Sequence, residues 1–126
     1  MNKKILVIED EEHVASVIED TLTFIKYDVY TASSGREGIK RAKEIKPDLI
    51  TLDIRMPDIY GLEILKILKA DALTKDIPVI VISGLDYNTK KECLEQGALD
   101  YFQKPLDFEF LKSRIVSITQ EAADKN

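Results

Sequence analysis

Three short, almost wholly apolar runs recur along the chain, at residues 5–8, 49–52 and 79–82. A continuous run of Ile, Leu and Val is typical of a strand that is buried on both faces of a parallel sheet. Two further strands are predicted: residues 27–32, which are rich in aromatic and β-branched side chains, and residues 99–103. No other feature of the sequence limits the choice of fold as strongly.

Apolar residues at helical spacing follow each predicted strand. The stripes contain Val14, Val17, Ile18, Leu22 and Ile25; Ile39, Ala42 and Ile45; Leu62, Leu65 and Leu68; and Phe108, Leu111, Ile115 and Ile118. A short helix is predicted at residues 87–96, closed by Gly97. The alternation predicts an α/β fold with a doubly wound, five-stranded parallel sheet and helices on both faces. Residues 1–126 are expected to form a single domain, with residues 121–126 as a fraying tail.

The composition excludes several classes of function. The chain has 18 Lys and Arg against 23 Asp and Glu, a net charge of −5 and no basic run, so direct binding to nucleic acid is not expected. No stretch approaches the length of a membrane span, and the apolar run at residues 5–8 ends in acids, unlike a signal peptide. A cytoplasmic protein without a membrane partner is therefore predicted. The single cysteine, Cys93, suits a reducing compartment and is predicted to be buried.

Charged and polar residues stand at the carboxyl ends of the predicted strands, which meet along one edge of a doubly wound sheet. They are Glu9 and Asp10, Asp53, Ser83 and Lys104. Carboxylates that converge in one crevice raise one another's pKa values unless a cation neutralises them. Carboxylates without His or Cys ligands favour a hard divalent ion, Mg²⁺ above all.

Asp53 is the candidate nucleophile of this group. Lys104 would add a fixed positive charge and Ser83 a hydroxyl group beside it. A carboxylate flanked by a metal ion, an ammonium group and a hydroxyl is suited to attack phosphorus, because each neighbour stabilises an oxygen of the transferred phosphoryl group. The predicted product is an aspartyl phosphate on Asp53.

The chain resembles the receiver domain of two-component response regulators over essentially its full length, with a stand-alone architecture like that of chemotaxis regulators. The motifs that carry the resemblance are Glu9-Asp10, Asp53 with Met56-Pro57 and Gly61, Ser83-Gly84, Tyr101 and Lys104-Pro105. The resemblance implies a flavodoxin-like (βα)5 fold with strand order 2-1-3-4-5. It also implies a phosphoacceptor that catalyses only its own phosphorylation and dephosphorylation, rather than an enzyme acting on other substrates.

The same resemblance implies a role for each site residue. Asp53 accepts phosphate from a sensor histidine kinase or a histidine phosphotransfer protein. Glu9 and Asp10 help to hold Mg²⁺, together with Asp53 and the backbone carbonyl of Arg55.

The implied switch uses residues further along the chain. Lys104 pairs with the phosphoryl oxygens, Ser83 moves to bond one of them, and Tyr101 swings inward behind it. The face formed by the fourth helix, the last strand and the last helix then changes shape and controls an unknown output partner. A cis peptide bond between Lys104 and Pro105 is also implied.

The sequence departs from the family pattern at a few positions. Glu9 stands where Asp is commoner, and Tyr60 precedes Gly61 where the family usually has Asp. Arg55 and Leu85 occupy positions that neighbour the water attacking the phosphoryl group in the family. Because Leu85 would exclude that water, a long-lived phosphorylated form is expected.

The output face carries a partial dimerisation pattern. Asp100 and Arg114 resemble charged pairs through which one receiver subfamily dimerises, whereas Phe110 stands where a charge is expected. An exposed Phe110 would equally suit a different partner. The expectation is a monomer or a weak homodimer through this face.

Three alternative functions remain open. A phosphatase with an aspartyl nucleophile would have a second Asp two residues after Asp53, where this chain has Arg55. A degenerate, phosphate-independent binding module would not need the complete set of site residues. A flavodoxin-like cofactor binder would need an anion-binding loop at residues 9–12, which are all acidic. The sole histidine, His13, is expected to face solvent rather than to carry a phosphoryl group.

Overall fold

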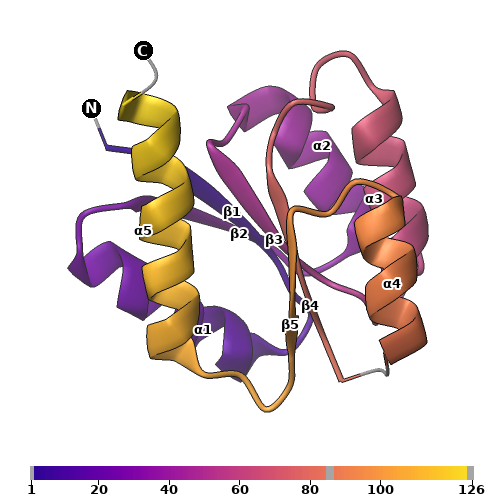
Figure 1. Cartoon of the computed structure of the whole chain (residues 1–126), viewed down its shortest axis with the longest axis horizontal. Coiled ribbons are helices and arrows are strands. Elements are labelled where there is room, and N and C mark those ends of the chain that lie inside the picture. Colours follow the sequence, from indigo (N-terminus) through magenta and orange to yellow (C-terminus); the bar gives the residue numbers. More distant parts are fainter. Residues whose placement is uncertain (1, 85–86, 125–126) are drawn as a thin grey trace.

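The computed structural model of the chain describes residues 2–84 and 87–124. Strands and helices alternate along it (Figure 1). The order is β1 (Lys4–Ile8), α1 (Glu12–Phe24), β2 (Asp28–Ala32), α2 (Gly35–Ile45), β3 (Leu49–Asp53), α3 (Gly61–Ala70), β4 (Val79–Ser83), α4 (Tyr87–Glu95), β5 (Asp100–Gln103) and α5 (Phe108–Asp124).

The five strands form one sheet in the order β2-β1-β3-β4-β5, and every neighbouring pair is parallel. The predicted fold and strand order are therefore confirmed. β1 pairs with β2 on one side and with β3 on the other. The order in which strands are added to the sheet therefore reverses between β1 and β3. Ligand sites of open α/β sheets lie at such a reversal, beyond the carboxyl ends of the strands.

Helices cover both faces of the sheet, as the doubly wound prediction requires. α1 and α5 lie on one side, and α2, α3 and α4 lie on the other (Figure 1). One buried cluster joins Ile5, Val7, Ile18 and Ile115 under α1 and α5. The apolar residues that alternate with these along β1 pack against the opposite helices. The central strands are thus buried on both faces, which accounts for their continuous apolar sequence.

The capping residues predicted from the sequence lie at the ends of the helices. Ser34 caps α2 by accepting a hydrogen bond from the backbone N–H of Glu37, whose carboxylate in turn accepts one from the backbone N–H of Ser33. Gly97 has φ +104°, the left-handed conformation expected of a glycine after a helix. The predicted burial of Cys93 is also confirmed, since its side chain is fully buried.

The last helix reaches further than its apolar stripe. α5 continues to Asp124, beyond the end of the stripe at Ile118. Residues 125–126 lie outside the described residues, so the predicted fraying of the tail stays a prediction. Nothing in the described residues forms a helix long and apolar enough to cross a membrane.

Candidate functional site

The carboxyl ends of the strands bring the predicted site residues to one edge of the sheet. Asp53 is the last residue of β3, Ser83 is the last residue of β4, and Glu9 directly follows β1. Lys104 directly follows β5, and its backbone N–H donates to the carbonyl oxygen of Ser83 at 2.8 Å. Hydrogen bonds of the sheet ladder therefore continue into the site and position these residues.

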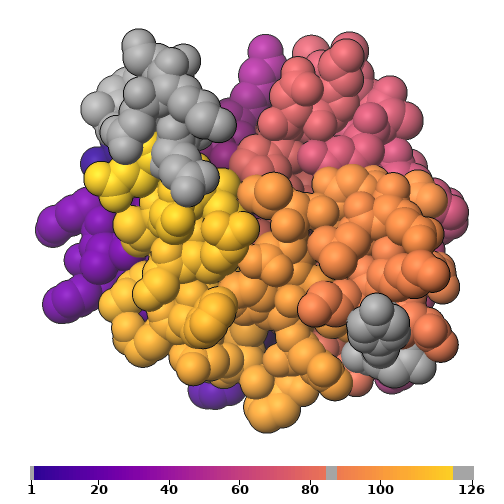
Figure 2. Space-filling view, viewed as in Figure 1, coloured from indigo at the N-terminus to yellow at the C-terminus, as the bar shows by residue number. Residues whose placement is uncertain are grey.

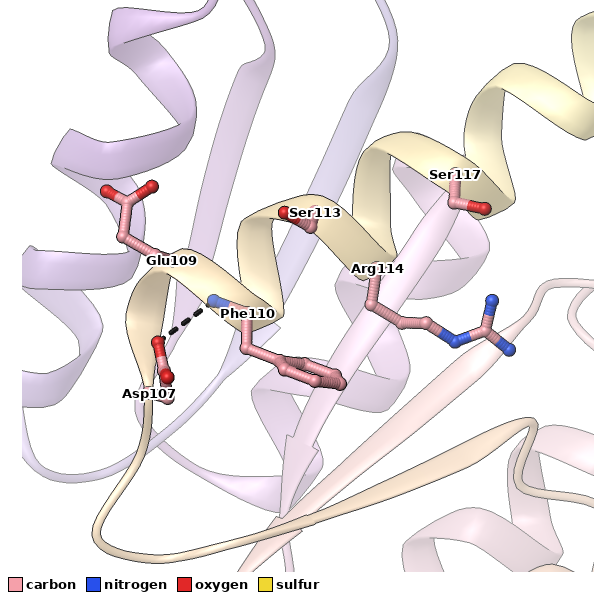
Figure 3. A pocket seen from close by; sticks show the side chains of 6 residues that line it. All are labelled: Asp107, Glu109, Phe110, Ser113, Arg114 and Ser117. Atoms are coloured by element: carbon pink, nitrogen blue, oxygen red, sulfur yellow. Dashed lines mark hydrogen bonds between the residues drawn. The ribbon is translucent and has the colours of Figure 1, made fainter.

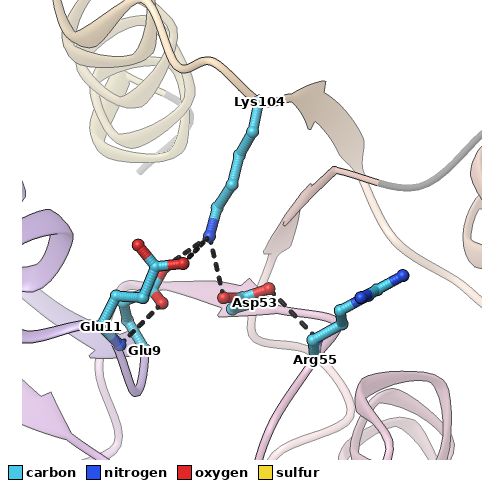
Figure 4. Close-up of polar contacts among 5 residues, drawn as sticks. All are labelled: Glu9, Glu11, Asp53, Arg55 and Lys104. Atoms are coloured by element: carbon cyan, nitrogen blue, oxygen red, sulfur yellow. Dashed lines mark hydrogen bonds and ion pairs between the residues drawn. The ribbon is translucent and has the colours of Figure 1, made fainter.

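Lys104 is the centre of the charge cluster (Figure 4). Its Nζ lies 3.0 Å from Oδ2 of Asp53, 3.4 Å from Oε1 of Glu11 and 3.6 Å from Oε1 of Glu9. The other oxygen of Asp53, Oδ1, accepts a hydrogen bond from the backbone N–H of Arg55 at 3.1 Å. The peptide bond between Lys104 and Pro105 is cis, as expected.

Three carboxylates of the site meet the requirements of a metal-binding group. Glu9, Asp10 and Asp53 each offer an oxygen, and these atoms lie within 4.8 Å of one another. Oε1 of Glu9 is buried and has no hydrogen-bond partner, while Oε2 accepts the backbone N–H of Glu11 at 3.1 Å. A buried carboxylate oxygen without a hydrogen bond is costly, and a hard cation would satisfy it. The donor set therefore fits Mg²⁺.

Burial and clustering change the pKa values of two residues in the site. Burial, followed by the neighbouring carboxylate of Asp53, raises the pKa of Glu9 to about 8, against the opposing effects of the Glu11 N–H and Lys104. Burial lowers the pKa of Lys104, but its contacts with Asp53, Glu9 and Glu11 outweigh this effect and raise the pKa. Mutual repulsion of carboxylates was predicted to raise their pKa values, but for Glu9 burial is the larger cause.

The stability of the metal-free protein is expected to fall as pH rises from about 4.5 to about 8, the interval between the ordinary and the folded pKa of Glu9. Folded Glu9 keeps its proton in this interval, whereas the unfolded chain releases it, so each rise in pH favours unfolding. At 1.36 kcal/mol per pKa unit, the Glu9 contribution over this interval is on the order of 5 kcal/mol. Urea unfolding in EDTA at several pH values measures it. The Glu9→Gln variant should lack most of this decline, and an equal decline in both proteins would contradict the prediction.

The two predicted switch residues are both buried. Ser83 is fully buried, and Tyr101 is 8% exposed and belongs to the cluster under α2, α3 and α4. The inward swing of Tyr101 that the resemblance implies stays a prediction; Tyr101 is already mostly buried in this structure. Leu85, which was expected to exclude the attacking water, lies outside the described residues, so the lifetime of the phosphorylated form stays a prediction. Arg55 is exposed beside the site.

The loop after β3 is held by backbone contacts and by Asp58. The two oxygens of Asp58 accept the backbone N–H groups of Gly35 and Arg36 at 2.7 and 3.0 Å, at the start of α2. The hydrogen bond from the Arg36 N–H, and to a smaller extent that from the Gly35 N–H, lowers the pKa of Asp58. At the start of α3, the side chain of Tyr60 makes no capping hydrogen bond.

Sequence reasoning missed one member of the site. Glu11 was recognised only as part of an acidic run, but its carboxylate contacts Lys104. Its place in the sequence, three residues after the end of β1 and directly before α1, gave no indication of that contact. The prediction that His13 faces solvent is confirmed, since the residue is exposed.

The predicted output face is formed by α4, β5 and α5, which lie beside one another in Figure 2. Asp100 and Arg114 pair with each other within the chain, with Nε 2.8 Å from Oδ2. The two charged residues that were considered for dimerisation therefore already form an ion pair with each other within one chain. Phe110 is 61% exposed, contacts Phe102 edge to face, and lines a groove along α5 (Figure 3).

Solved structures share this architecture. A CheY-like response regulator receiver domain protein from Methanospirillum hungatei JF-1 superposes with a TM-score of 0.90 at 26% identity, covering 100% of each chain. The receiver domain of the Francisella response regulator 1452 gives a TM-score of 0.90 at 30% identity, covering 96% of this chain and 99% of that chain. The fold is therefore the flavodoxin-like fold of CheY-like receiver domains.

The family model of the response regulator receiver domain matches residues 5–116, and the chain belongs to this family of two-component signalling proteins. PhoP of Bacillus subtilis (strain 168), the alkaline phosphatase synthesis transcriptional regulatory protein, is 38% identical over 123 residues, which are 97% of this chain and 50% of that protein. The response regulator PleD of Caulobacter vibrioides (strain NA1000 / CB15N) is 37% identical over 121 residues, 95% of this chain and 27% of PleD. The chain thus spans half or less of the length of these two relatives.

Proposed function

We propose that the chain is a phosphorylation switch in which Asp53 accepts a phosphoryl group in a Mg²⁺-dependent reaction. The observation that carries the proposal is the ammonium group of Lys104, 3.0 Å from the Asp53 carboxylate. Membership of the receiver family supports it, because phosphorylation is the general switch of that family. Glu9, Asp10, Asp53 and the backbone carbonyl of Arg55 are the proposed metal ligands, Ser83 and Tyr101 the proposed switch residues.

In the proposed reaction, a carboxylate oxygen of Asp53 attacks the phosphorus atom of the donor. An O–P bond forms, the bond from phosphorus to the leaving atom breaks, and its electron pair departs with that group. The leaving group is the imidazole of a phosphohistidine or, with a small donor, acetate. Lys104 stays beside the transferred oxygens and offsets their charge. Glu9, Asp10 and Asp53 would hold Mg²⁺, which would supply further positive charge for the transfer.

The proposed partners follow from this chemistry. A sensor histidine kinase or a histidine phosphotransfer protein would supply the phosphoryl group, and a downstream protein would bind the face of α4, β5 and α5. Residues 1–126 would act as one receiver domain in the cytoplasm, as a monomer or a weak homodimer. Exposed Phe110 supports a protein partner on the output face.

Phosphorylation is tested by incubating the protein with acetyl phosphate, with Mg²⁺ or with EDTA, followed by intact mass measurement. The wild type is expected to gain one phosphoryl group only with Mg²⁺, and Asp53→Ala is expected to gain none. Asp48→Ala is the matched control, because Asp48 lies at the opposite end of β3 and accepts the backbone N–H of Lys4; it should still be phosphorylated. A folded wild type that gains no phosphoryl group would favour the phosphate-independent binding module instead.

A further inference from the structure

Glu11 is the exposed partner of Lys104. Its side chain is 61% exposed, whereas those of Asp53 and Glu9 are 4% and 2% exposed. Its backbone N–H donates to Oε2 of Glu9 at 3.1 Å, and its carboxylate reaches back to the ammonium of Lys104 at 3.4 Å (Figure 4). Glu11 therefore lies on the solvent side of the cluster.

The three carboxylates around Lys104 differ in what an arriving phosphoryl group does to them. Asp53 is the acceptor itself, and Glu9 belongs to the proposed metal group. Glu11 belongs to neither, and it offers Lys104 only a negative charge. A phosphoryl oxygen that pairs with the ammonium must therefore compete with the carboxylate of Glu11 for the same donor.

We propose that Glu11 is a positioning residue that holds the ammonium of Lys104 in the unphosphorylated protein and competes with the phosphoryl group for it. The proposal rests on the proposed roles of Asp53 and Lys104. Its consequence concerns free anionic phosphodonors such as acetyl phosphate. The donor must displace the carboxylate of Glu11 from the ammonium of Lys104 before it can bind there. Glu11 therefore raises the donor concentration at which phosphorylation is half-saturated.

The exposure of Glu11 sets the expected size of its effect on the half-saturating donor concentration. Ion pairs with an exposed partner are weak and screened by salt, so removing the charge should change the half-saturating concentration by about three- to fivefold. The contact lies at the solvent boundary, so raising the ionic strength from about 0.01 M to about 1 M should reduce the difference.

The test compares phosphorylation rates over a range of acetyl phosphate concentrations in Mg²⁺. Glu11→Gln keeps the shape of the side chain and removes its charge, whereas Glu11→Asp keeps the charge and shortens the side chain by one methylene. Glu12→Gln is the matched control, because Glu12 is the exposed first residue of α1 and is not among the partners of Lys104 within the described residues.

Glu11→Gln is expected to lower the half-saturating concentration about three- to fivefold with less than a twofold change in the maximal rate. Glu11→Asp should shift it in the same direction, and Glu12→Gln should leave it within about 1.5-fold of the wild type. Equal effects of Glu11→Gln and Glu12→Gln would assign the change to overall charge and overturn the proposal. So would an unchanged or raised half-saturating concentration in Glu11→Gln.

A second readout needs neither metal nor donor. In the metal-free protein, the side-chain NMR signal of Lys104, assigned with Lys104→Arg, should shift in Glu11→Gln and stay in place in Glu12→Gln; an unmoved signal in Glu11→Gln overturns the contact. If the wild type gains no phosphoryl group at all, the proposed function fails and this inference with it. If the wild type is phosphorylated and Glu11→Gln behaves identically, this inference alone fails.

Discussion

Replacing Lys104 with methionine is expected to slow phosphorylation of Asp53 by acetyl phosphate about a hundredfold or more. Lys104 is the cation that contacts the Asp53 carboxylate, at 3.0 Å, and its side chain is only 22% exposed. Methionine has a similar length and no charge, so the attacking carboxylate and the incoming phosphoryl oxygens would face each other without it. Lys104 is partly shielded from water, so its charge should stabilise the transition state strongly. The expected effect is therefore larger than the effect of removing an exposed ion pair on protein stability.

Lys112→Met is the matched control for this variant. Lys112 is also partly buried, at 30% exposure, and pairs with a carboxylate, that of Glu109 at 2.7 Å, three residues earlier in α5. Its loss should leave the initial rate of phosphorylation, followed by intact mass, within about twofold of the wild type. A Lys104→Met protein that is phosphorylated at the wild-type rate would remove Lys104 from the proposed mechanism.

Gly61→Ala is expected to lower the free energy of unfolding by about 2 to 4 kcal/mol. A Cβ at this position would lie 2.4 Å from Cα and 2.7 Å from the carbonyl oxygen of Ile54, and 2.9 Å from the carbonyl oxygen of Asp53. All three are backbone atoms, so the loop after β3 must move rather than a side chain. Such a shift would also strain the 2.7 Å hydrogen bond from the Gly61 N–H to the Ile54 carbonyl oxygen.

Gly84→Ala makes the same chemical change where there is space for it. A Cβ on Gly84 meets nothing within 4 Å, so its effect on stability should be within about 1 kcal/mol. Urea unfolding of both variants in EDTA measures the difference. Equal losses in the two proteins would show that the close approach of Gly61 to Ile54 does not control stability.

The fold was readable from the sequence because burial on both faces leaves a strong local pattern. The central strands β1, β3 and β4 lack polar alternation, and each ends on or just before a polar or charged site residue. Helical spacing between them then favours only parallel, crossover-connected strands. Asp53, Glu9 and Lys104 could be brought together from this alone, because the carboxyl ends of parallel strands share one edge of the sheet.

Contacts that depend on side-chain direction were not readable in this way. The pairing of Glu11 with Lys104 joins residues 93 positions apart in sequence. The capping of α2 by Asp58 joins the loop after β3 to a helix that precedes it. Asp100 and Arg114 suggested contacts between subunits, but β5 and α5 place them within reach of each other. Each of these contacts depends on how loops and helices lie over the sheet.

The sequence by itself determined the class of fold, the family and the identity of the residues at the edge of the sheet, because hydrophobic periodicity and strand ends are local properties of the chain. Only the tertiary structure decided the electrostatic state of that edge. It buried Glu9 and left Oε1 without a hydrogen bond, and it placed the ammonium of Lys104 beside three acidic side chains, those of Asp53, Glu11 and Glu9. The physical reason is that burial and ion-pair distances depend on which distant segments meet in space.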